Sequence, residues 1–210
     1  MAKPIKSKRP KPRDSFFDDA FTHMRVEPSE ELKQWVFDSI ISPTGKLHNE
    51  DHEILVDADI QFMFASGGFS KKQKVVIGQA EKVQFMAGGW QRARQIQQMM
   101  DWFGYVPEFI ITLDAQYCAS CSDSEFCALV EHELYHIRQK LDAFGEPKFN
   151  DEGGPSFEIC GHDVEEFIGV VRRYGASEQV NKMVQAAKGK PEVSAVNIAH
   201  SCGTCLKATN

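Results

Sequence analysis

The pattern His-Glu-x-x-His at residues 132–136 constrains this chain more than any other feature of its sequence. At 3.6 residues per helical turn, His132 and His136 lie on one face of a helix, where two imidazole nitrogens can reach a single Zn²⁺. Glu133 then stands beside them as the candidate general base. This spacing is the signature of zinc hydrolases, and it requires that residues 132–136 form a helix.

The residues around the motif predict such a helix. Ser122 and Glu125 match a capping box, which predicts a helix that begins after Ser122 and runs to about Phe144, where Gly145 and Pro147 stop it. The apolar residues of this segment recur at helical spacing: Phe126, Val130, Leu134, Ile137 and Leu141. This stripe lies roughly 140° from the histidines, so one face is predicted to pack and the other to bind.

The remaining segments predict an α+β fold of the zincin-like type, with a small β-sheet beside the motif helix and further helices around it. The predicted strands cover residues 58–64, 74–80 and 107–114. The other predicted helices cover residues 29–42, 90–103, 164–174 and 177–188. In the helix after the motif we expect a buried stripe of Val164, Phe167, Ile168 and Val171.

Length and charge predict one domain with two tails. Of the 210 residues 42% are hydrophobic, which suits one sizeable core. We expect a basic, Pro-rich disordered tail (1–27), a metallopeptidase-like domain (28–188) and a C-terminal tail (189–210). The basic tail could contact nucleic acid weakly or only solubilise the chain, whereas the net charge of −6 argues against a broad nucleic-acid face. The sequence shows neither a membrane span nor a secretion signal, which predicts a cytoplasmic protein.

A catalytic zinc needs three protein ligands and one open position, so the motif requires a third ligand. Asp142 has the spacing that metzincins use, but those proteins need a glycine where this chain has Gln139. Glu166, or its neighbour Glu165, would serve if the ligand is a glutamate from a second helix. We favour His162, because imidazole is a common zinc ligand and its face lies opposite the apolar stripe. Glu166 could instead orient an imidazole.

Three stretches of the sequence together resemble the phage metallopeptidase family and, more distantly, SprT-like zinc proteases. They are the motif at 132–136, Gly-His-Asp-Val-Glu-Glu-Phe at 161–167 and Arg-Arg-Tyr-Gly at 172–175. The resemblance extends over roughly residues 30 to 175. It implies a compact zincin-type fold, His162 as the third ligand, and a phage- or prophage-encoded protein that acts in the host cell. It implies no particular substrate.

These residues predict a zinc-dependent peptidase. The ion would lower the pKa of its bound water, Glu133 would take the proton, and the resulting hydroxide would attack a carbonyl that the metal polarises. The strand at 109–113 could hold an extended peptide by adding it to the sheet, which favours a polypeptide substrate. The alternatives are another amide, such as an isopeptide bond, and a non-catalytic zinc-stabilised phage or prophage module that binds a host protein or nucleic acid.

The cysteines allow a second metal site. Cys118 and Cys121 form one C-x-x-C pair and Cys202 and Cys205 form another, and the four thiolates could bind a structural Zn²⁺. Reduced thiols without a metal and a redox pair are the alternatives. Cys160 is expected to pack in the core, because free cysteine is among the most buried residue types.

Overall fold

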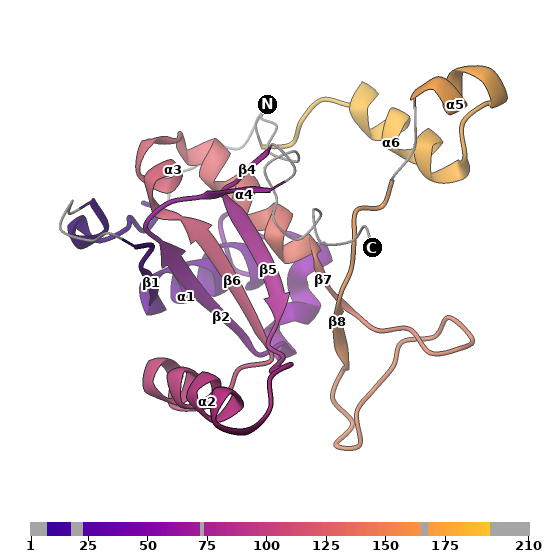
Figure 1. Ribbon diagram of the computed structural model, residues 1–210. Helices are drawn as coiled ribbons and strands as arrows, with labels where there is room; N and C mark the ends of the chain where they lie inside the picture. Colours follow the sequence, from indigo (N-terminus) through magenta and orange to yellow (C-terminus); the bar gives the residue numbers. More distant parts are fainter. Residues whose placement is uncertain (1–7, 18–22, 72–73, 165–167, 194–210) are drawn as a thin grey trace.

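A four-stranded mixed β-sheet forms the centre of the computed structural model (Figure 1), which describes residues 8–17, 23–71, 74–164 and 168–193. In order across the sheet, the strands are β1 (Val26–Pro28), β2 (Ile60–Ala65), β6 (Phe109–Asp114) and β5 (Gly78–Lys82). β2 and β6 run parallel, and β1 and β5 run antiparallel to them. The structure is therefore α+β with a small sheet, as the sequence predicts.

β6 confirms the predicted strand at 107–114 but lies inside the sheet. Its residues pair with β2 on one side and with β5 on the other. The expectation that this strand holds an extended peptide is therefore wrong, because both of its hydrogen-bonding edges are already used. The segment at 74–80 also differs from the prediction. It is divided into β4 (Lys74–Val76), which pairs with β3 (Phe69–Lys71) in a separate hairpin, and β5.

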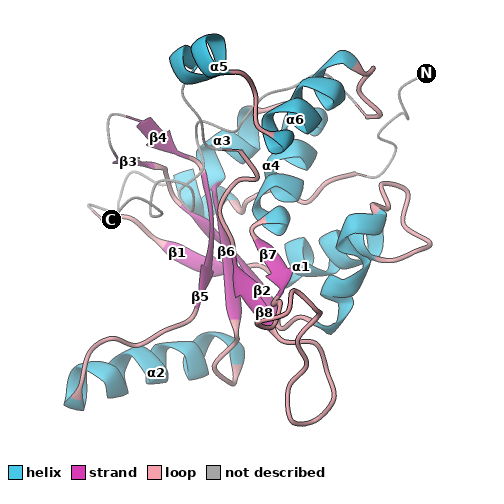
Figure 2. Cartoon of the chain, turned by 90° about the vertical axis from the view of Figure 1, so that its right-hand side faces the viewer, coloured by secondary structure: helices cyan, strands magenta, loops and turns pink. Residues whose placement is uncertain are grey.

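One face of the sheet packs against the helices α1 (Glu30–Val36) and α4 (Asp123–Tyr135), which Figure 2 shows on the same side of the sheet. Ser29 caps α1, and a π-helical turn (η2, Phe37–Ile41) extends the helix to Ile41, which confirms the helix predicted over residues 29–42. A 3₁₀ segment follows (η3, Glu50–Asp57). The core between these elements consists largely of aliphatic and phenylalanine side chains, among them Leu32, Val36, Ile40, Phe62, Phe109, Ile111, Phe126 and Val130.

The motif helix begins where the sequence predicts and ends much earlier. The capping box of Ser122 and Glu125 is present in full, but α4 stops at Tyr135 with His136 as its C-cap. The chain then continues as β7 (Ile137–Gln139), paired with β8 (Phe157–Ile159). Ile137 is buried as a strand residue, whereas Leu141 is 54% exposed. The prediction of a helix to Phe144 is wrong. After Tyr135 the chain leaves the helix, and residues 137–139 pair with β8 instead.

Four further α-helices of the described residues lie around this centre. α2 (Gly89–Phe103) ends at Gly104, which adopts the left-handed conformation of a C-cap with φ of 78°, and α3 (Ala115–Ser120) joins β6 to α4. α5 (Ile168–Tyr174) and α6 (Glu178–Lys188) follow β8 and confirm the predicted helices there. Figure 1 shows them outside the sheet. Among the described residues, no helix has the length and hydropathy that a bilayer span requires.

The buried stripe that we expect in the segment 164–174 is absent from α5. None of the residues of α5 is buried, and Ile168 is 77% exposed. Val164 precedes the helix and is half-buried, while Phe167 lies outside the described residues. An amphipathic spacing predicts a helix correctly here, but it does not predict that the apolar side packs against the core.

The N-terminal segment packs against the domain from residue 8 to residue 17. Arg9 is only 6% exposed and forms an ion pair of 2.6 Å with Asp123. Its guanidinium also donates to the carbonyl oxygens of Cys118 and Cys121 and lies over the Phe126 ring. The expectation of a disordered tail over residues 1–27 is wrong for this part, because the five donors of a guanidinium can satisfy carbonyls at the end of a helix. Arg9 is thereby removed from any contact with nucleic acid.

Replacing Arg9 should destabilise the fold. In Arg9→Gln the carbonyls of Cys118 and Cys121 lose the guanidinium that donates to them, so the free energy of unfolding should fall by about 1 to 3 kcal/mol. Lys11→Gln is the matched control, since Lys11 is an exposed cation of the same segment, and should change stability by less than about 0.5 kcal/mol. Urea denaturation measures both values. Equal stability of the two variants would show that Arg9 does not anchor the segment.

Candidate metal centre

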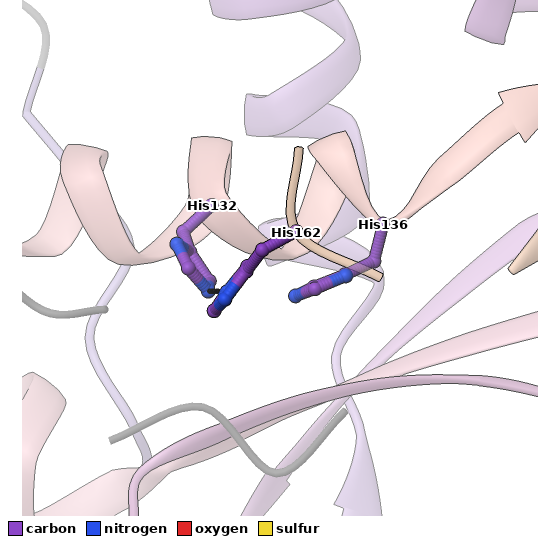
Figure 3. Close-up of side chains that lie close together, drawn as sticks. All are labelled: His132, His136 and His162. Carbon is purple, nitrogen blue, oxygen red and sulfur yellow. Dashed lines mark hydrogen bonds between the residues drawn. The ribbon is translucent and has the colours of Figure 1, made fainter. Parts of the chain in front are cut away.

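Three histidine side chains converge at the C-terminal end of α4. His132 lies in the last turn of the helix, His136 is its C-cap, and His162 follows β8. Figure 3 shows the three rings directed toward a common space. One ring nitrogen of each lies within 4.8 Å of the others, and Nε2 of His132 and Nε2 of His162 are 3.3 Å apart. Two nitrogens bound to one tetrahedral zinc are separated by about 3.3 Å, so the distance between His132 and His162 fits such an ion.

The β7–β8 hairpin explains how a residue 26 positions after His136 reaches the same place. The chain leaves the helix along β7 and returns along β8, with Ile137 opposite Ile159. Cys160 is then the partner of His136, and its backbone N–H donates to the His136 carbonyl at 2.9 Å. His162 follows two residues later. The register of β7 and β8 fixes the point at which the chain returns to His136, so the position of His162 does not depend on the length of the loop between the two strands.

Cys160 also orients the ring of His136. Nδ1 of His136 lies 2.8 Å from the Cys160 carbonyl oxygen. Because a carbonyl only accepts, Nδ1 carries the proton and Nε2 retains the lone pair that a metal needs. The expectation that Cys160 packs in the core is wrong: it is half-buried, and its thiol donates to the Tyr135 carbonyl. Sequence reasoning misses this role because any residue provides the same carbonyl.

The surroundings of His132 favour its neutral form. Burial, together with smaller contributions from charge repulsion by His136 and His162, lowers the pKa of His132 to about 4. His132 is therefore uncharged at neutral pH. A neutral imidazole is the form that binds a metal ion.

Glu133 lies on the side of α4 that faces β5. Its side chain is fully buried, and α4 approaches the strand so closely that a Cβ on Gly78 would lie 2.7 Å from Glu133 Oε1 and 2.8 Å from Leu129 Cδ1. The sequence offers no sign of this contact. Glycine is required at Gly78 because no side chain fits between the strand and the helix, not because of its backbone freedom.

The other predicted ligands have different outcomes. Asp142 is exposed and caps a turn, where its carboxylate accepts from the N–H groups of Phe144 and Glu146. It is not part of the histidine cluster. Glu165 and Glu166 lie outside the described residues, and so their predicted roles remain predictions.

The second predicted zinc site is only partly within the described chain. Cys118 is fully buried, and burial raises the pKa of its thiol well above the ordinary value; the pKa of Cys121 is raised as well. Cys202 and Cys205 lie outside the described residues. The four-cysteine site remains a prediction.

A family model described as "Putative phage metallopeptidase" matches residues 33–188. The chain belongs to this family. The match includes the motif helix and all three histidines, and it confirms the resemblance seen in the sequence. No match was found among curated proteins or among solved structures. Membership indicates a metal-dependent peptidase, a hydrolase that acts on polypeptides.

The space in front of the histidines is a pocket of about 370 Å³. The described residues that line it are His132, Tyr135, His136, Gly161, His162, Asp163, Val164 and Met183. Met183 belongs to α6 and lies 47 residues after His136 in the sequence, so a helix distant in the chain contributes to the pocket beside the three histidines. The pocket is large enough for a peptide side chain.

Gly78→Ala tests the close packing of α4 against β5. The added methyl group must displace the buried side chains of Glu133 and Leu129, so the free energy of unfolding should fall by about 1 to 3 kcal/mol. Gly88→Ala is the control, since a Cβ at Gly88 has no atom within 4 Å, and it should be nearly neutral. Thermal and urea denaturation give both values. A neutral effect of Gly78→Ala would contradict the described packing.

Proposed function

We propose that the protein is a zinc-dependent peptidase in which His132, His136 and His162 hold the ion and Glu133 is the general base. One observation carries the proposal: three imidazole nitrogens within 4.8 Å of one another, in a chain of a metallopeptidase family. The α+β fold would then be a zincin-type fold, with the motif helix beside the sheet. A phage- or prophage-encoded enzyme of this kind would act in the cytoplasm of the host cell.

The donor set favours zinc. Three nitrogen ligands from histidine suit Zn²⁺, and catalytic zinc sites have three protein ligands with one position left open. Among the described residues the cluster holds three members, which matches this number. A structural zinc site would more often close the fourth position with another protein ligand.

The histidines and Glu133 would divide the work of hydrolysis. When bound, the ion acts as a Lewis acid that lowers the pKa of water and polarises the peptide carbonyl. Glu133 accepts the proton of the attacking water and later returns it to the leaving amine. His136 keeps its position during these steps because Nδ1 donates to the Cys160 carbonyl. The products are two peptides, one with a new carboxylate and one with a new amine.

Glu133→Gln separates metal binding from catalysis. The variant should retain about one zinc per chain, as measured by mass spectrometry of the metal, because the three histidines are unchanged. Cleavage of a reduced, alkylated and therefore unfolded protein should fall at least 100-fold, since a general base contributes about 10² to 10⁴ to the rate. Glu131→Gln is the control on the same helix. Its side chain accepts a hydrogen bond from Asn49, which glutamine can preserve.

Two outcomes would contradict the proposal. Full activity of Glu133→Gln would show that Glu133 is not the general base. A wild-type protein that binds zinc through the three histidines but cleaves no unfolded substrate would instead support a zinc-stabilised binding module.

A further inference from the structure

α6 exposes an apolar stripe that the core does not use. Four of its residues recur at helical spacing: Val180, Met183, Val184 and Ala187. None is buried, and Met183 and Val184 are 51% and 42% exposed. Apart from Ala186 the rest of the helix is polar, so α6 is amphipathic without packing its apolar side into the core. Exposed apolar side chains that gather on one face of a helix are candidates for contact with a bound molecule.

The stripe meets the candidate metal centre at Met183. This side chain lines the same pocket as the three histidines, together with Tyr135 and Val164. The lining is therefore mixed, with three imidazoles beside the apolar and aromatic groups of Met183, Val164 and Tyr135. Asp163 is the one carboxylate among the described lining residues, and it is exposed.

We propose that Met183, with Val164 and Tyr135, forms a side-chain pocket that selects peptides with a large apolar residue next to the cleaved bond. The inference rests on the proposed peptidase function and names its substrate class. A peptide held at the histidines brings the side chains beside its cleaved bond close to Met183, Val164 and Tyr135, since these residues line the same pocket. Methionine is flexible and polarisable, so it adapts to leucine, methionine or phenylalanine and does not select one shape.

The volume and composition of the pocket support this class of substrate. A space of about 370 Å³ is large enough for a leucine or phenylalanine side chain. Contact of such a side chain with Met183 and Val164 removes apolar surface from water, which stabilises the complex. A lysine or glutamate side chain would cover the apolar groups of Met183 and Val164 less well than leucine does, and the exposed Asp163 offers lysine only a partner screened by solvent. Discrimination should therefore act on binding of the peptide, through KM more than kcat.

Binding to the zinc-loaded Glu133→Gln protein tests the inference without cleavage. The probes are four fluorescent, capped Gly/Ser heptapeptides that carry a single central Leu, Ala, Lys or Glu, and fluorescence anisotropy gives Kd. The Leu peptide should bind about 10- to 100-fold more tightly than the others. Met183→Ala in the same background should weaken the Leu peptide about tenfold and leave the Ala peptide nearly unchanged. Met183→Glu should shift the preference toward the Lys peptide.

Gln185→Ala is the control for the helix, because Gln185 is an exposed residue of α6 outside the apolar stripe and should leave all four Kd values unchanged. Equal effects of Met183→Ala on all four peptides, or a wild-type preference for Lys, would overturn the inference while leaving the peptidase function intact. Cleavage by the wild type without a preference for a large apolar residue next to the cleaved bond would also overturn the inference. Binding of the Leu peptide without cleavage by the wild type would contradict the peptidase function alone.

Discussion

The pairing of His136 with Cys160 is the interaction on which the candidate site depends. The Cys160 N–H donates to the His136 carbonyl, and the Cys160 carbonyl accepts from Nδ1 of the same residue. The first contact ends α4 and begins the β7–β8 pairing, and the second sets the tautomer of the ring. One residue thus terminates the motif helix and orients the ring of a candidate metal ligand. His162 reaches the cluster only because β8 returns the chain to this point.

The local elements of the fold were predictable because local signals determine them. The capping box at Ser122, the C-cap at Gly104 and the helix start at Ser177 are each satisfied by atoms within four residues. The end of α4 was not predictable in the same way. Ile137 fits the helical stripe and also fits a buried strand position, and its pairing with Ile159 decides between them. Periodicity alone cannot distinguish these two environments.

The residues of the candidate site and the contacts around it show the same difference between local signals and partners that the fold supplies. His132, Glu133, His136 and His162 could be selected from the sequence, because imidazole and carboxylate chemistry is specific to residue type. Gly78, Cys160 and Arg9 could not. Gly78 acts by lacking a side chain, Cys160 acts through its backbone, and Arg9 binds carbonyls more than 100 residues away. Such roles depend on the partner that the fold supplies.

X-ray absorption at the zinc edge tests the central claim most directly, since it reports the type and number of ligands independently of any activity. For the ion at the histidines we expect three imidazole nitrogens and a fourth light-atom ligand, and we expect His162→Ala to lose one imidazole. Only two imidazoles in the wild type, or a spectrum that His162→Ala leaves unchanged, would contradict the three-histidine site.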